Sequence, residues 1–310
     1  MHVVVAIAAL AVASTTHSFV TPDGRTRSWH EHVPPSSSKA APPRSMPVVI
    51  VLHGGGGNGE SVEKNTSFAQ KADERGFIAV YPEGVGHAKF HTWNANARCC
   101  GEALQEHVDD VAFLVSLVEQ LAKEHGIDRK RVFLVGHSNG AAMAERALCE
   151  RPDVFAGAAV VSSPGLAGIC TPKQARPVLV IHGTADKCAS YEPKPECGGC
   201  WERALSSLFG VDMKPTLFSC DGAQAIADSW RNPTNASTDM ITRTVEAAQC
   251  ARAKTATAPV ELCTIEGGGH AFPGDVVPCR RGRRACEAYV SEVGEPAKLD
   301  VPALVASFFL

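Results

Sequence analysis

Six short apolar runs, rich in β-branched residues, alternate along the chain with longer segments whose apolar residues recur at helical spacing. Runs of this length and composition are typical of buried strands, which we expect at residues 47–53, 77–81, 131–135, 157–161, 177–181 and 260–265. The segments between them predict helices at residues 61–75, 108–125 and 141–150. This alternation predicts an α/β fold with a mostly parallel central sheet and helices on both faces.

The two flanks of this pattern are different in character. Residues 19–34 predict a β-hairpin around the turn Pro22-Asp23-Gly24-Arg25. Residues 187–259 break the alternation and are rich in cysteine, proline and glycine. We expect them to be an insertion over the cleft near the active site, with at least one helix near residues 224–230. The expected organisation is one domain, residues 19–310, that contains this insertion.

The strand at 131–135 leads into Gly136-His137-Ser138-Asn139-Gly140, a G-x-S-x-G motif followed by a predicted helix. Strand, sharp turn and helix form the setting of a nucleophile elbow. The two glycines fit it because strand and helix approach too closely for a β-carbon. We therefore expect Ser138 to be a nucleophile rather than part of an ordinary strand-to-helix turn.

An acid and a base follow in the order that this motif requires. Asp186 comes just after the strand at 177–181, and His270 follows the strand at 260–265 through a run of glycines. Open α/β sheets place their sites at the carboxyl ends of strands. A serine hydroxyl needs a base to take its proton, and that base needs an acid to orient it. We predict that His270 and Asp186 fill these roles rather than serving as ordinary turn residues.

A glycine-rich loop, residues 54–59, follows the strand at 47–53. Its position is that of an HGGG-type oxyanion loop, so we expect the backbone amides of Gly55 and Asn139 to form the oxyanion hole. A phosphate-binding loop is disfavoured, because no Gly-Lys-Ser/Thr follows the glycines.

The N-terminus and the cysteines together indicate secretion. Residues 3–13 are apolar over the length of a signal-peptide core and too short to span a bilayer, with a small-residue cleavage site at Ala11-Val12-Ala13. We expect residues 1–18 to be a signal peptide, although an unusually apolar first strand is the alternative. The twelve cysteines suit disulfides in an extracellular protein, with pairings left open. Asn65 and Asn235 begin glycosylation sequons.

Charge and motif content argue against several partners. The net charge of −3 gives no attraction to nucleic acid or anionic membranes. Cys197-Gly198-Gly199-Cys200 has no second ligand pair, so we expect disulfides there and no metal or other cofactor. Residues 280–284 are mostly arginine, which predicts a solvated loop rather than a binding site for anionic polysaccharide or a processing site. We expect a monomer.

With these residues in view, the chain resembles the secreted esterase family that includes polyhydroxybutyrate depolymerases and feruloyl esterases. The resemblance extends from about Trp29 to Phe308. It rests on blocks at residues 52–54, 76–82, 93–95, 99–101, 108–111, 136–140, 182–186, 267–270 and 273–274. It implies the α/β-hydrolase fold and places Ser138, Asp186 and His270 at the triad positions. Two departures are Ala141, where the family commonly has glycine, and Phe272, where it often has tryptophan.

The resulting hypothesis is a secreted serine esterase that acts on feruloyl or acetyl esters of plant-type polysaccharide. Trp93 and Phe272 are candidates for stacking on the substrate, and packing in the core is an equal alternative for Trp93. A short-chain polyhydroxybutyrate depolymerase is the alternative on the same machinery, and a serine peptidase is a weaker one. From another class, a secreted binding protein with a dormant hydrolase fold is also considered.

Overall fold

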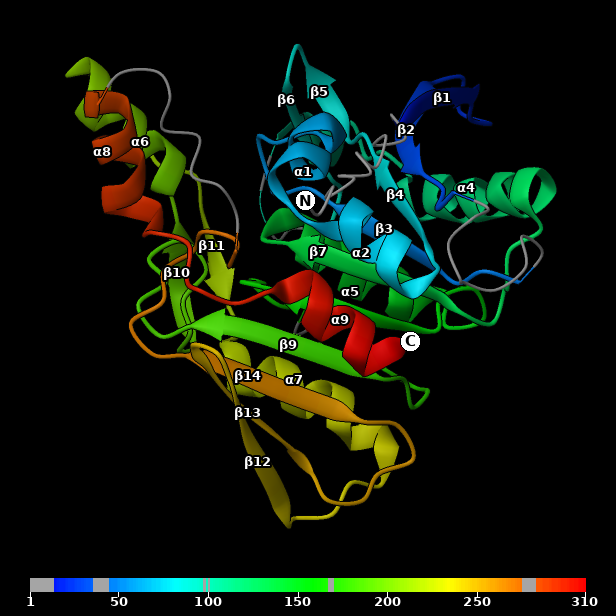
Figure 1. The fold of residues 1–310 in the computed structure, drawn as a ribbon. Helices are drawn as coiled ribbons and strands as arrows, with labels where there is room; N and C mark the ends of the chain where they lie inside the picture. The colour runs from blue at the N-terminus through cyan, green and yellow to red at the C-terminus, as the bar shows by residue number, and fades with distance from the viewer. Residues whose placement is uncertain (1–13, 36–44, 97–98, 100, 167–169, 275–282) are drawn as a thin grey trace, which may run out of the picture.

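The structure is a computed structural model, and it describes residues 14–35, 45–96, 99, 101–166, 170–274 and 283–310. Within these residues the main sheet has ten strands in the order β1-β2-β4-β3-β7-β8-β9-β14-β13-β12 (Figure 1). The strands are β1 (Thr15–Val20), β2 (Thr26–His32), β3 (Val48–Leu52), β4 (Ile78–Pro82), β7 (Val132–His137), β8 (Gly157–Val161), β9 (Val178–Gly183), β12 (Met240–Val245), β13 (Ala248–Ala253) and β14 (Val260–Ile265).

The six strands from β4 to β14 in this order are parallel, and antiparallel strands extend the sheet at both edges. The expected mostly parallel sheet is therefore confirmed. The N-terminal hairpin is also present, but it begins at Thr15 rather than at residue 19. Residues 1–13 lie outside the described part, and residues 15–18 of the expected signal peptide belong to β1.

Helices cover both faces of the sheet (Figure 1). They are α1 (Gly59–Asn65), α2 (Phe68–Arg75), α3 (Gly101–Gln105), α4 (Asp110–His125), α5 (Asn139–Glu150), α6 (Cys200–Phe209), α7 (Ala223–Arg231), α8 (Arg283–Val293) and α9 (Val301–Phe309), with a 3₁₀ turn at Asn232–Thr234. Alternate residues of β3 point to opposite faces, as the period of a strand requires. Val48, Ile50 and Leu52 pack with residues of α4, α5 and α7, whereas Val49 and Val51 pack with residues of α2 and α9.

The helix expected over 61–75 is two helices, α1 and α2. Thr66 has an extended backbone, and its hydroxyl donates a hydrogen bond of 2.7 Å to the carbonyl of Val62. Hydroxyl side chains that bond to nearby backbone compete with helix continuation, which explains the break. Asp109 is the N-cap of α4. Asp110 is instead buried and holds the Arg27 guanidinium at 2.7 Å.

Only the first half of the segment 187–259 contributes residues to the pockets beside Ser138. Its first half forms a small two-stranded sheet of β10 (Lys194–Gly198) and β11 (Leu217–Cys220), with α6 between them. Its second half contains α7, which packs on β9 and β14, and the strands β12 and β13, which extend the main sheet. The helix predicted near residues 224–230 is confirmed as α7.

Four disulfides are present among the described residues. They join Cys149 to Cys170, Cys188 to Cys200, Cys197 to Cys220 and Cys250 to Cys263. The two cysteines of the C-x-x-C motif bond to different partners, so the motif is structural, as expected. Most of the arginine-rich loop, residues 280–282, lies outside the described residues. In the described part of the chain, no helix has the length and apolarity to cross a bilayer.

Candidate active site

Ser138 lies at the turn between β7 and α5, where the sequence predicts a nucleophile elbow. Its backbone has φ 54° and ψ −118°, a strained conformation for a residue with a side chain. A β-carbon on Gly136 would lie 2.1 Å from the Gly140 carbonyl oxygen, and one on Gly140 would lie 2.3 Å from that of His53. Both glycines are therefore required by close approach of the backbone. The turn is fixed further by the Ser138 amide, which donates to the Val161 carbonyl of β8 at 2.9 Å.

The structure brings Ser138, His270 and Asp186 together, although more than 40 residues separate each from the next. His270 Nε2 lies 2.9 Å from Ser138 Oγ, and His270 Nδ1 lies 2.8 Å from Asp186 Oδ2. This is the arrangement in which the imidazole takes the serine proton while the acid orients the ring.

Asp186 is held as an anion by its surroundings. Its Oδ1 accepts hydrogen bonds from the amides of Cys188 and Ala189, both at 2.8 Å. Burial by itself raises the pKa of Asp186. The charge of His270 and the hydrogen bonds from His182 and His270 outweigh burial and hold the pKa well below its usual range. The carboxylate is thus ionised at any pH where the protein is expected to work.

His137, inside the serine motif, links the nucleophile turn to the histidine loop. Its Nε2 donates a hydrogen bond of 2.7 Å to the backbone carbonyl of His270, whose amide in turn donates to Val293 at 2.6 Å. Burial, followed by the nearby charge of His270, lowers the pKa of His137 to about 3. The ring is therefore neutral and serves as a fixed donor. Sequence reasoning missed this role, because the middle positions of G-x-S-x-G accept many residue types.

The glycine-rich loop after β3 is held with one amide facing the cleft. The Gly54 carbonyl accepts hydrogen bonds from His53 Nδ1 at 2.8 Å and from the Gly57 amide at 3.0 Å. A trans peptide is planar, so fixing this carbonyl directs the Gly55 amide of the same peptide the opposite way. Within the described residues, the Gly55 amide donates to no protein acceptor, and Gly55 lines the cleft beside Ser138. The geometry suits an oxyanion donor.

His53 is a neutral ring in one defined tautomer. Its Nδ1 donates to Gly54, and its Nε2 accepts from the Gly84 amide at 3.0 Å. Burial lowers the pKa of His53 to about 4. Accepting at Nε2 requires the uncharged ring, so His53 positions the loop without changing charge near neutral pH.

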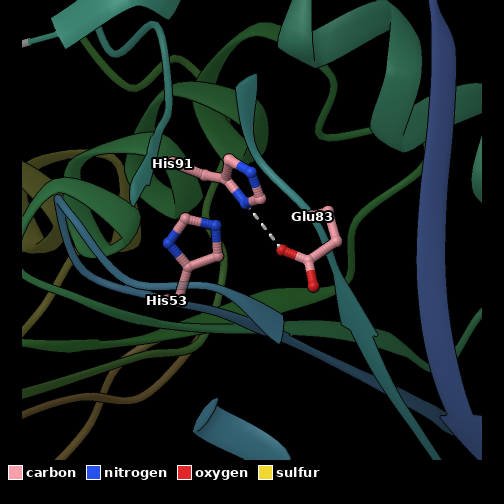
Figure 2. A group of neighbouring side chains, drawn as sticks. All are labelled: His53, Glu83 and His91. Carbon is pink, nitrogen blue, oxygen red and sulfur yellow. Dashed lines mark hydrogen bonds and ion pairs between the residues drawn. The ribbon is translucent and has the colours of Figure 1, made fainter. Parts of the chain in front are cut away.

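His53 also belongs to a group with Glu83 and His91 whose side chains lie close enough to suggest a metal site (Figure 2). Figure 2 shows a bond between His91 and Glu83, while His53 bonds to neither of them. The distance from His91 Nδ1 to Glu83 Oε2 is 3.0 Å. Glu83 Oε2 also accepts from the Gly59 amide at 3.0 Å. A metal ligand needs a free lone pair, and the one on His53 Nε2 is occupied by Gly84. The group is thus better described as a hydrogen-bonded support for the oxyanion loop.

Trp93 is buried against His53 and Asn139 and is not placed to stack on a substrate. It is 0 % exposed, and its indole Nε1 donates to the His53 carbonyl at 3.0 Å. The Asn139 side chain bonds to both the amide and the carbonyl of Trp93, at 2.7 and 3.0 Å. Trp93 therefore packs in the core, the alternative weighed in the sequence analysis, and links His53, at the start of the glycine-rich loop, to Asn139.

Two compartments meet at Ser138 and His270. The small compartment is lined mainly by apolar groups of the insertion, including Cys188, Cys200 and Phe218. The large compartment is lined by the oxyanion loop, by polar side chains of α1, and by Phe272. Phe272 is thus at the cleft, with its edge against the His137 ring. Trp201 lines both compartments, a residue that the sequence analysis did not single out.

Comparison with known proteins agrees with this geometry. A family model described as esterase PHB depolymerase matches residues 28–185. A protein named putative esterase NocK, from Nocardia uniformis subsp. tsuyamanensis, is 31% identical over 87% of this chain and 78% of its own length. Feruloyl esterase B of Piromyces equi is 30% identical over 67% of this chain, which spans 36% of that protein.

One solved structure supports the fold over nearly the whole chain. The acetyl xylan esterase from Aspergillus awamori superposes with a TM-score of 0.56 at 14% identity, covering 90% of this chain and 99% of that one. The sheet order, the serine turn and these relatives lead to one conclusion. The protein has the α/β-hydrolase fold, is a carboxylic ester hydrolase, and belongs to the esterase PHB depolymerase family.

Proposed function

We propose that this protein is a secreted serine esterase that cleaves acetyl or feruloyl esters of plant-type polysaccharide through an acyl-enzyme. The observation that carries the proposal is the hydrogen-bonded series Ser138–His270–Asp186 beside a free amide of the glycine loop. It provides a nucleophile, a base, an orienting acid and an oxyanion donor in one cleft. A dormant binding protein would have no need to keep all four.

The proposed reaction proceeds in two halves. Ser138 Oγ attacks the ester carbonyl while His270 Nε2 takes its proton, and the amides of Gly55 and Asn139 hold the developing oxyanion. His270 then protonates the alcohol oxygen, the alcohol leaves, and the acyl group stays on Ser138. Water, deprotonated by His270, releases the acid and restores the serine. No metal or organic cofactor takes part in this scheme.

Secretion and substrate class rest on separate observations. Four disulfides are typical of proteins that fold in an oxidising compartment. The names of the relatives point to feruloyl and acetylxylan esters, and the large compartment contains polar side chains that suit a sugar. The alternative is a polyhydroxybutyrate depolymerase, favoured by the family description and by the exposed apolar residues Phe209, Val211 and Met213.

Turnover of four esters separates these functions. We expect the wild type to hydrolyse p-nitrophenyl acetate and at least one of methyl ferulate and acetylated xylo-oligosaccharide, and to prefer the latter two over hydroxybutyrate trimers. Ser138→Ala should lower kcat by roughly 10⁶-fold, or below detection, because the nucleophile acts with the rest as a unit. Preference for the trimers would favour the depolymerase. Wild-type protein with intact disulfides that hydrolyses none of them would contradict the proposal.

A further inference from the structure

Two exposed aromatic side chains flank the oxyanion loop at the mouth of the cleft. Phe90 is 69% exposed and Trp201 is 46% exposed, whereas large aromatic residues are usually well covered. Both lie within 4 Å of the position that a β-carbon on Gly56 would occupy, next to the oxyanion donor Gly55. At distances of 3.8 and 3.9 Å a β-carbon would fit there without a clash, so the Gly56 backbone leaves space beside both rings.

Phe90 is fixed relative to the oxyanion loop. It begins β6 (Phe90–Thr92), which pairs with β5 (Val85–His87) in a short hairpin. The hairpin is attached to the loop by the Gly56 amide, which donates to the His91 carbonyl at 2.9 Å, and by the His91 amide, which donates to the Gly57 carbonyl at 3.0 Å. Phe90 is thus exposed without being loosely attached.

Trp201 is fixed from the other side of the cleft. The preceding residue, Cys200, is joined by a disulfide to Cys188, whose amide binds the Asp186 carboxylate. The Trp201 ring also packs against Tyr289 of α8, with centroids 5.4 Å apart. One ring of the pair is therefore anchored to the oxyanion loop, and the other to the loop of the proposed catalytic acid.

The surroundings of the pair favour an amphipathic ring as its occupant. Two aromatic faces that remain in contact with water suit a ligand with apolar faces and polar edges. Ser61 and Thr66 line the adjoining large compartment, and their hydroxyl oxygens, which donate to Asn58 and to the Val62 carbonyl, can accept hydrogen bonds from those edges. A pyranose ring has this character, with C–H groups on its faces and hydroxyls around its rim. A hydroxybutyrate chain has no hydroxyls for such groups to bind.

We propose that Phe90 and Trp201 form a subsite for a sugar ring in the alcohol half of the substrate. The acyl group then enters the small apolar compartment, which also reaches Ser138. This inference rests on the proposed function, since it assigns the alcohol side of the same reaction. Binding of the sugar across the oxyanion loop would place the ester carbonyl beside Gly55.

The test compares two esters of the same acid that differ only in the alcohol. For Phe90→Ala and Trp201→Ala, kcat/KM is measured on an acetylated xylo-oligosaccharide and on ethyl acetate. We expect the ratio of the two values to fall roughly tenfold in each variant, mostly through KM for the sugar ester, as expected on losing an aromatic contact of about 1.4 kcal/mol. Trp201→Phe should retain most of the ratio. The matched control is Phe209→Ala, an exposed aromatic of α6 that lines neither compartment and is not among the atoms nearest to Gly56.

The possible outcomes separate this inference from the proposed function. An unchanged ratio in both variants would overturn the subsite. It would also be overturned if kcat/KM fell for hydroxybutyrate trimers but not for the sugar ester. If the wild type cleaves ethyl acetate but no sugar ester, the proposed function fails. The subsite is then decided by calorimetry of unesterified xylo-oligosaccharide with the wild type and both variants. Binding that both substitutions weaken would support it, and an absence of binding would overturn it.

Discussion

At the scale of single residues, the site depends on histidines with different tasks. His270 is bonded on both ring nitrogens, to Ser138 and Asp186, and is placed to move a proton. His53 and His137 are buried, neutral and committed to backbone groups. A histidine that must stay uncharged in the folded protein makes stability depend on pH.

The sign of this dependence for His137 follows from its pKa, about 3 when folded and about 6.5 in an unfolded chain. Between these values the unfolded state binds more protons, so the free energy of unfolding decreases as pH falls through this window. Between pH 7 and pH 4.5 this contribution falls by about 2 to 3 kcal/mol. The free energy of unfolding is measured by chemical denaturation at the two pH values. Its decrease from the higher to the lower pH should be smaller by this amount in His137→Gln than in the wild type.

His107→Asn provides the control, because His107 is exposed and asparagine tolerates its backbone φ of 51°. It should show the same drop as the wild type. An equal drop in His137→Gln and the wild type would mean that His137 is not held neutral in the folded protein.

At the scale of elements, the loop between β3 and α1 depends on His53 for its shape. His53→Ala removes the donor to the Gly54 carbonyl, and we expect kcat to fall roughly 10- to 100-fold, because a misdirected Gly55 amide weakens oxyanion binding. KM should change less, since the loop acts mainly on the transition state. Binding of a boronate transition-state analogue should weaken by a similar factor.

His53→Asn is the matched variant, because its amide nitrogen can occupy nearly the position of Nδ1. It should recover a large part of the lost kcat. A His53→Ala variant that changes KM and kcat together, or neither, would contradict a role in positioning the loop.

Most of the regular elements could be predicted from the sequence, because buried strands and amphipathic helices have strong periodicity. The strands Gly157–Val161 and Val260–Ile265 were predicted to the residue. The break between α1 and α2 was missed, since it depends on one hydroxyl bond of Thr66. The position of Trp93 was left open for a similar reason. A tryptophan after a strand is equally common in a core and at a cleft, and only its contacts with His53 and Asn139 decide between them.

At the scale of the whole molecule, the insertion shows what the sequence could not specify. Strands β12 and β13 add to the main sheet, but β12 is exposed along most of its length and has no clear alternation to reveal it. The cysteine pairings depend on which loops meet in space, so their spacing alone leaves them open. The residues proposed as triad could be predicted, because their chemistry fixes both their order and their places at strand ends. The aromatic pair at the cleft mouth could not be predicted, because Phe90 and Trp201 are far apart in the sequence and come near each other only in the folded chain.

The measurement that tests the central claim most directly is covalent trapping of the nucleophile. The protein is treated with a fluorophosphonate, digested and analysed by mass spectrometry, beside Ser138→Ala and His270→Ala. We predict a single adduct on Ser138 that appears together with loss of esterase activity. No adduct should form in Ser138→Ala, and labelling of His270→Ala should be slowed by several orders of magnitude. Labelling of another residue, or ester hydrolysis that persists in Ser138→Ala, would contradict the account.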